Sequence, residues 1–369
     1  MSKIIDFRVD PNNYRHWRVD YDGAIANLYM DVDEDGGLFD GYQLKLNSYD
    51  LGVDIELNDI VQRMRFEHPE VKVVVMRSAK DKVFCAGANI RMLGGAAHSH
   101  KVNFCKFTNE TRNAYEAAEE ESGQKYIAAV KGACAGGGYE LALACNHIML
   151  TDDSQSSVAL PEVPLLAVLP GTGGLTRVTD KRKVRRDLAD IFCATEEGVK
   201  GKRAKDWKLV DDVFKNSVFD EKVVERANEF VAASSKSEVN AGVKLNPLQR
   251  QIDENGSVAY SCVEVTIDRE GRTATVTLNG PDQPAPKTMD DFQAQGDQAY
   301  LLRLAREFED AILHLRLNEM DIGQPAPSVR LALLAHKPSH ERRRTGRRHN
   351  GRNQRVGAEA EASYLVDSL

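Results

Sequence analysis

From the start of the chain to about Ala232, short apolar runs alternate with longer amphipathic stretches, which is typical of an α/β domain. Trp17 to Asp31 predicts a hairpin with its turn at Asp22-Gly23. Four apolar runs predict further strands: Val71 to Met76, Tyr126 to Val130, His147 to Thr151 and Ser157 to Leu160. The first of these is rich in valine, so we expect a strand buried on both faces. The intervening patterns predict helices over Gly52 to Phe66, Lys101 to Ser122, Tyr139 to Cys145 and Leu188 to Lys208.

A shorter pattern of the same kind follows. Residues 233–257 are rich in serine, lysine and glycine and indicate a linker between a first domain, residues 1–232, and what comes after. Val263 to Leu278 repeats the plan of the first hairpin, and Leu301 to Asn318 predicts an amphipathic helix. A complete second copy would need roughly a hundred further residues or more. We therefore expect an incomplete second lobe over residues 258–323.

Residues 324–369 form an arginine-rich tail whose positive charge is opposite to the net charge of −7 for the whole chain. We expect no strand in this tail, where Val329 to Ala335 is the one apolar run. A nucleic-acid- or membrane-binding extension, a disordered end and a changed reading frame would each account for it. We favour the last two, because the composition changes in the middle of an incomplete domain.

The overall composition indicates a globular protein, with 42% hydrophobic and 28% charged residues. No apolar run is long enough for a membrane helix and the first residues lack an apolar signal core, so we expect a cytoplasmic protein that does not bind membranes. The negative net charge argues against nucleic acid as a partner. The six cysteines are scattered and the histidines show no ligand spacing, so neither a disulfide framework nor a metal site is expected.

Two segments of small residues are candidates for placing backbone N–H groups against a ligand. Phe84-Cys-Ala-Gly-Ala-Asn-Ile90 follows the buried strand, and Gly132-Ala-Cys-Ala-Gly-Gly-Gly-Tyr-Glu140 leads a strand directly into a helix. The start of a helix leaves unpaired N–H groups with partial positive charge, which suits a developing oxyanion. Close packing of strand against helix would explain the glycines of the second segment equally well.

Two carboxylates accompany these segments. Glu140 stands in the first turn of an apolar helix, where complementing the helix dipole is its ordinary role. Glu162 follows Pro161 within apolar sequence, and burial of such a carboxylate raises its pKa toward acid–base use. Pro170-Gly-Thr-Gly-Gly174 adds a loop that could close over a site. Packing alone explains this combination less well than a shared active site does.

In order and spacing, these segments resemble the crotonase (enoyl-CoA hydratase) superfamily. The resemblance implies an α/β fold with a ββα spiral core in the first lobe, followed by the start of a second crotonase-like lobe. It implies an oxyanion hole formed by the N–H groups of Ala88 and Gly137, and catalysis by Glu140 and Glu162. It also implies a CoA-thioester pocket that includes Ala86, Asn89 and Gly136.

Further segments, among them Lys45-Leu-Asn-Ser-Tyr-Asp-Leu-Gly-Val-Asp54 and Thr176-Arg-Val-Thr-Asp-Lys-Arg-Lys183, resemble one branch, the benzoyl-CoA-dihydrodiol lyases. The likeness ends near Gly323. It implies cleavage of 2,3-epoxybenzoyl-CoA by water to 3,4-didehydroadipyl-CoA semialdehyde and formate in aerobic benzoate degradation. It implies no cofactor beyond the coenzyme A of the aromatic acyl-CoA substrate, and a homo-oligomer, a dimer in the intact family.

The same branch points to Cys105 as an active-site residue, although an inert thiol in the core of a helix is the alternative. Two other functions stay open at this point. One is another crotonase-type reaction, such as hydration or isomerisation of an enoyl-CoA. The other is an inactive CoA-binding remnant.

Overall fold

The computed structural model describes residues 4–236, 241–281, 284–323 and 329–334. Its first part is built on a six-stranded sheet with the order β1-β2-β4-β7-β9-β11. The predicted hairpin is confirmed as the antiparallel pair β1 (Trp17–Asp22) and β2 (Ile25–Met30). The other strands run parallel to β2 and to one another. They are β4 (Val73–Ser78), β7 (Lys125–Val130), β9 (His147–Asp152) and β11 (Asp212–Lys215).

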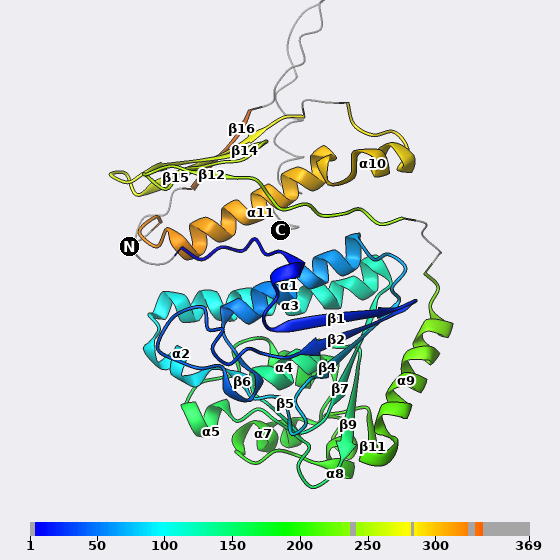
Figure 1. Cartoon of the computed structure of the whole chain (residues 1–369). Helices are drawn as coiled ribbons and strands as arrows, with labels where there is room; N and C mark the ends of the chain where they lie inside the picture. The colour runs from blue at the N-terminus through cyan, green and yellow to red at the C-terminus, as the bar shows by residue number, and fades with distance from the viewer. Residues whose placement is uncertain (1–3, 237–240, 282–283, 324–328, 335–369) are drawn as a thin grey trace, which may run out of the picture. The chain divides into compact units, whose positions relative to one another are not determined.

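Helices cover both faces of this sheet (Figure 1). On one side, α1 (Leu51–Phe66) and α3 (His98–Ser122) lie against each other and over the sheet, and on the other side lies α9 (Asn216–Ala233). Both faces of strand β4 are apolar because each packs against a separate hydrophobic cluster. Val74 and Met76 belong to the main core, whereas Val73 and Val75 pack with the α9 side chains. The prediction of a strand buried on both faces is therefore confirmed.

Two small sheets stand beside the large one and carry the glycine-rich turns. The three-stranded sheet has the order β10-β8-β5, and the two-stranded sheet joins β3 to β6. Their bounds are β3 (Ser48–Tyr49), β5 (Val83–Cys85), β6 (Gly87–Ala88), β8 (Ala133–Ala135) and β10 (Ser157–Ala159). Three helices begin shortly after strands of these sheets: α2 (Ile90–Gly95), α4 (Gly137–Ala144) and α5 (Glu162–Leu166).

The predicted helical segment Leu188 to Lys208, whose pattern Gly198 and Gly201 punctuate, is helical only in part. The structure has α7 (Arg186–Ala194) and α8 (Gly201–Asp206), separated by an extended segment. In that segment the backbone of Val199 exchanges two hydrogen bonds with Val158 of β10, at 2.8 and 3.0 Å. Gly201 has a φ of +46°, a left-handed value that glycine adopts without strain. This backbone pairing of Val199, which lies between Gly198 and Gly201, interrupts the helical pattern.

After α9, residues 241–249 contain no helix or strand, as a linker would, but their backbone is held against the first domain. The N–H of Val243 donates to the Phe66 carbonyl at 2.7 Å, and that of Leu245 donates to the Glu67 carboxylate at 2.7 Å. Both side chains are buried.

The next residues form a five-stranded sheet with the order β12-β13-β14-β15-β16. The predicted second hairpin and amphipathic helix are confirmed, whereas β12 (inside the predicted linker), β13, α10 and β16 were not predicted. The strands are β12 (Gln251–Ile252), β13 (Val258–Ala259), β14 (Val263–Asp268), β15 (Thr273–Asn279) and β16 (Val329–Leu334), and the helices are α10 (Met289–Gln295) and α11 (Tyr300–Asn318).

The apolar run in the arginine-rich tail forms β16, which pairs parallel to β15. The expectation of no strand there is corrected, because β15 offers a free edge to this run. The rest of the tail, residues 324–328 and 335–369, lies outside the described residues. Helix α11 contacts α3 through an ion pair between Arg316 and Glu110 at 2.9 Å.

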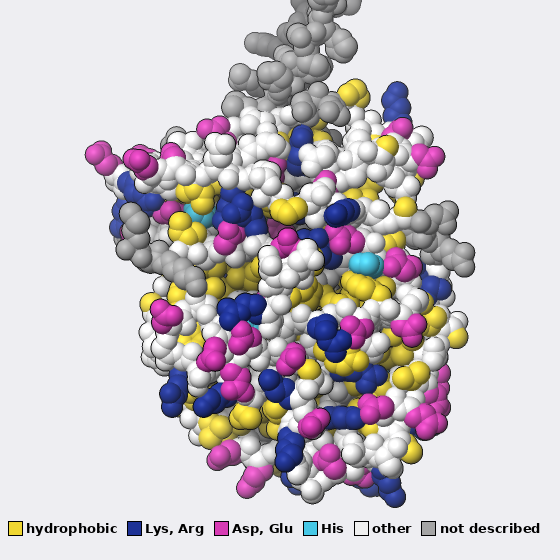
Figure 2. Space-filling view, viewed as in Figure 1, with side chains coloured by type: hydrophobic (Ala, Val, Ile, Leu, Met, Phe, Trp, Pro, Cys, Tyr) yellow, Lys and Arg dark blue, Asp and Glu magenta, His cyan; other side chains and the backbone are white. Residues whose placement is uncertain are grey.

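The described surface mixes charges of both signs. On the face seen in Figure 2, basic and acidic side chains alternate over short distances and hydrophobic side chains lie between them. Among the described helices, none combines the length and the apolar character that a membrane span requires.

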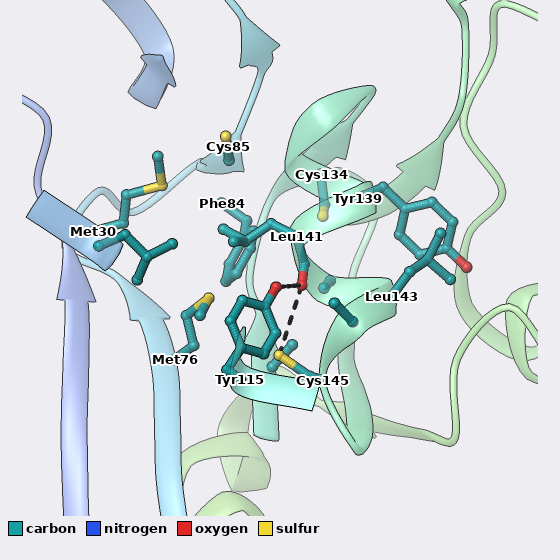
Figure 3. Packing of buried hydrophobic residues seen from close by; sticks show 14 of the residues in the cluster. Met30, Met76, Phe84, Cys85, Tyr115, Cys134, Tyr139, Leu141, Leu143 and Cys145 are labelled. Carbon is teal, nitrogen blue, oxygen red and sulfur yellow. Dashed lines mark hydrogen bonds between the residues drawn. The ribbon is translucent and has the colours of Figure 1, made fainter. Parts of the chain in front are cut away.

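The core beneath the small sheets is closely packed around α4 (Figure 3). Met76 of the large sheet and Phe84 of β5 meet Tyr115 of α3 and Leu141 of α4 there, all at most 2% exposed. The Tyr115 hydroxyl donates to the Leu141 carbonyl at 2.6 Å, which satisfies the one polar group of this buried ring. This hydrogen bond ties the middle of α4 to α3.

Candidate functional site

The two glycine-rich turns lie directly against each other. Gly87 has a φ of +87°, and a Cβ atom at this position would come within 2.7 Å of the Ala135 carbonyl oxygen and 2.9 Å of the Gly137 nitrogen. Only glycine allows this approach. It brings Ala88, the next residue, beside Gly137, whose N–H is in the first turn of α4 and has no partner within the helix. The predicted oxyanion pair is therefore brought together.

A cavity of about 550 Å³ opens next to these turns. Its polar wall contains the predicted Ala86, Ala88, Gly136 and Gly137, together with Glu140 and Glu162. Its apolar wall is formed by Phe104, Ile90, Leu93, Leu165, Leu166, Val168 and Leu169. A mostly apolar cavity with a few convergent polar groups is the usual form of a small-molecule site. Within the described part of the chain, no group of three or more His, Cys, Asp or Glu side chains is placed to hold a metal ion.

Asn89 is the one predicted pocket residue outside this cavity. Its side chain caps α2 by accepting the Met92 N–H at 3.0 Å, and it donates to the Gln43 carbonyl and the Ser48 hydroxyl at 2.8 and 3.0 Å. It lines a neighbouring cavity, also of about 550 Å³, whose walls include Lys45 and Arg91. The structure thus gives Asn89 a capping role in the turn that carries Ala88.

Glu140 is buried and held on both carboxylate oxygens. Its Oε1 accepts the backbone N–H groups of Thr172 and Gly174 at 3.0 and 2.8 Å, and its Oε2 accepts the Thr172 hydroxyl at 2.5 Å. The predicted closing loop therefore orients this carboxylate. A Cβ atom on Gly174 would come within 2.8 Å of Glu140, so the glycine is required for the contact.

Glu162 differs from Glu140 in its hydrogen bonding. It is half-buried at the start of α5, and its Oε2 is buried without a hydrogen-bond partner among the described residues. Burial, together with the nearby charge of Glu140, raises the pKa of Glu162 to about 7. A carboxyl group of this kind can both give and take a proton near neutral pH. The two glutamates thus share a site but differ in environment.

Cys105 of α3 also lies at the cavity, near the closing loop. A Cβ atom on Gly171 would be 2.8 Å from the Cys105 sulfur. Burial and then the charge of Glu140 raise the pKa of this thiol. Cys105 therefore lies in the wall of the site, in surroundings that disfavour its thiolate form.

Two further site residues were not predicted: Tyr49, which lines the cavity, and the fully buried Arg112 of α3, which contacts Tyr49. A signal for Arg112 was present in the sequence. It continues the apolar stripe of α3 at helical spacing, with Phe104, Thr108 and Tyr115, so a charge at this position had to be buried. Tyr49 gave no comparable signal, because β3 is only two residues long.

Comparison with known proteins gives three kinds of match. The family profile described as Enoyl-CoA hydratase/isomerase matches residues 43–277. A curated benzoyl-CoA-dihydrodiol lyase from Aromatoleum evansii is 57% identical over 323 residues, which cover 88% of this chain. The chain spans 58% of the length of that relative.

Solved structures show the same fold. An enoyl-CoA hydratase from Geobacillus kaustophilus is 32% identical, with a TM-score of 0.52, covering 60% of this chain and 78% of that one. An enoyl-CoA hydratase from Bacillus anthracis is 27% identical, with a TM-score of 0.51, covering 59% and 77% respectively. These matches confirm the predicted crotonase resemblance and its α/β fold.

Proposed function

The chain belongs to the enoyl-CoA hydratase/isomerase family, and on this premise we propose that it is a ring-opening lyase of aromatic acyl-CoA thioesters. Its substrate is 2,3-epoxybenzoyl-CoA, which it cleaves with two waters to 3,4-didehydroadipyl-CoA semialdehyde and formate. The name and the 57% identity of the Aromatoleum evansii relative support this choice of substrate.

One observation carries the proposal: a single cavity contains two adjoining backbone turns and two carboxyl groups of unlike environment. Ala88 and Gly137 would bind the thioester oxygen while it gains enolate charge. Donors placed in advance for such a charge contribute about 3 to 4 kcal/mol each to the transition state in well-studied hydrolases. The apolar wall around Phe104 would take the ring.

The two carboxyl groups would divide the proton transfers. Glu140, fixed by the Thr172 loop, would orient a water molecule. Glu162, whose Oε2 has no hydrogen-bond partner in the described part of the chain and whose pKa is raised to about 7, would exchange protons with water and the ring carbons. Such transfers account for roughly 10²- to 10⁴-fold in rate.

The test is turnover of freshly prepared 2,3-epoxybenzoyl-CoA by this chain, with formate measured as the product. We expect formate in proportion to enzyme, and little hydration of crotonyl-CoA. Hydration of crotonyl-CoA without formate would instead support the second candidate, an enoyl-CoA hydratase, which the two solved hydratase structures favour. Binding of benzoyl-CoA with neither reaction would contradict both candidates and leave a CoA-binding remnant.

The pKa of Glu162 offers an independent check on the site. In the parent chain, a [δ-¹³C]glutamate resonance should titrate near pH 7 and be absent from Glu162→Gln. In Glu140→Gln, the same resonance should titrate at lower pH, because a neighbouring negative charge no longer opposes ionisation. Glutamine can keep these contacts. Its side-chain carbonyl can accept the N–H groups of Thr172 and Gly174, and its amide can donate to the Thr172 hydroxyl. Titration at an unchanged pH in Glu140→Gln would mean that the two groups do not interact.

A further inference from the structure

Tyr49 touches both of the turns that form the candidate oxyanion hole. In the two-stranded sheet Tyr49 pairs with Ala88, and its carbonyl accepts the Asn89 N–H at 2.8 Å. At its other end, the hydroxyl reaches Gly137, where a Cβ atom would lie only 2.1 Å from the Tyr49 oxygen. The phenol therefore stands against the Cα of Gly137, in the wall of the cavity.

The hydroxyl of Tyr49 has a proton to give. Its oxygen accepts a hydrogen bond from Arg112 Nη2 at 2.6 Å. A guanidinium group can only donate, so this contact leaves the O–H of Tyr49 unused. Among the residues that the structure describes, none accepts it. Burial raises the pKa of Tyr49 far above its ordinary value, so the phenol keeps its proton at any physiological pH.

Arg112 holds this arrangement in place. Its side chain is completely buried, and it also donates to the carbonyls of Thr108 at 2.6 Å and Gly137 at 3.1 Å. Asp54 lies 3.5 Å away and supplies the opposite charge. The guanidinium thus fixes the phenol of Tyr49 and the backbone of Gly137 relative to each other.

We propose that the Tyr49 hydroxyl is a third hydrogen-bond donor to the thioester oxygen, beside the N–H groups of Ala88 and Gly137, with Arg112 as its positioning residue. This proposal depends on the proposed function in one respect, which is that the cavity binds an acyl thioester. A neutral carbonyl oxygen has two lone pairs, whereas an enolate oxygen has three. The bond from Tyr49 therefore strengthens as charge develops, which favours the transition state over the bound substrate.

The test compares Tyr49→Phe with Tyr115→Phe. Each variant removes one buried hydroxyl and keeps its ring, and Tyr115 bonds to Leu141 in the core, outside the cavity lining (Figure 3). The readout is the carbonyl stretch of bound [carbonyl-¹³C]benzoyl-CoA, which hydrogen bonds move to lower frequency. We expect Tyr49→Phe to return the band part of the way toward its value in free solution, and Tyr115→Phe to leave it in place. With epoxide substrate, kcat of Tyr49→Phe should fall roughly 10- to 100-fold with little change in KM, because one donor of several is lost.

An unchanged band in Tyr49→Phe would overturn the proposal, and so would an equal movement in both variants, which would indicate general loosening. The proposed lyase activity can be disproved independently of the third donor. If the band responds to Tyr49→Phe but no formate forms, the third donor stands and the lyase is wrong. If benzoyl-CoA does not bind to the parent chain, both are wrong.

Discussion

Replacing Glu162 with glutamine is expected to lower formate release by roughly 10²- to 10⁴-fold while making the protein more stable above pH 7. The activity falls because the glutamine amide cannot exchange protons. The shape of the side chain is kept, and Oε2 of Glu162 has no hydrogen bond to lose among the described residues. Benzoyl-CoA should therefore bind to the variant as it does to the parent.

The gain in stability follows from the raised pKa of Glu162. A carboxyl group with a pKa of about 7 in the folded state, and about 4.3 in the unfolded chain, favours folding less as the pH rises from about 4 to 7. The variant lacks this group, so above pH 7 it should gain about 1 to 2 kcal/mol in unfolding free energy, a value reduced for the partial exposure of Glu162. Below pH 4 the gain should vanish.

Denaturant unfolding of parent and variant at pH 8 and pH 4 measures this difference directly. Glu197→Gln, at an exposed position between α7 and α8, is the matched control and should change neither activity nor stability. If Glu162→Gln lost stability at pH 8, the carboxylate would be a structural anchor and not a strained catalytic group. If it kept full activity, Glu162 would have no part in the proton transfers.

Much of the large sheet and the helices α1 and α3 could be predicted because their signals are local, whereas β11 and α9 were not predicted. The valines of β4 and the hairpins β1–β2 and β14–β15 follow from strand periodicity and turn residues. The candidate oxyanion pair, Ala88 and Gly137, was implied by the resemblance to the crotonase family, and the glycine-rich segments by themselves indicated only where backbone N–H groups could face a ligand. Gly87 and the glycines before Glu140 mark places where only a missing Cβ permits contact, and the structure brings those places together.

The remaining features depend on contacts between distant segments, which periodicity does not report. Val199 leaves a helical pattern because Val158 offers its backbone. The three bonds that orient Glu140 come from residues more than thirty positions away, so the sequence indicated a closing loop but not its role. Tyr49 and Arg112 are 63 positions apart, and neither has an obvious partner until α3 packs against α1.

Arg112→Met is expected to lower the unfolding free energy by about 3 to 5 kcal/mol at pH 8, because removing one member of a buried ion pair leaves the other charge uncompensated. Methionine has a similar volume, so the loss is mainly electrostatic. Burial raises the pKa of Asp54 to about 6 even with Arg112 present. Without Arg112 this pKa should be higher still, so Asp54 takes up a proton at pH 5 and the deficit of the variant should be smaller there than at pH 8.

The double variant Asp54→Asn, Arg112→Met separates the two roles of Arg112. Because neither partner of this ion pair is then left as an uncompensated charge, most of the stability should return and its dependence on pH between 5 and 8 should weaken. The Tyr49 hydroxyl would still lack the guanidinium that directs it, so the carbonyl stretch of bound benzoyl-CoA should stay displaced toward the free value in both variants. Recovery of the band together with stability would show that Arg112 only supports the fold. A displaced band in a stable double variant would show that it positions the donor.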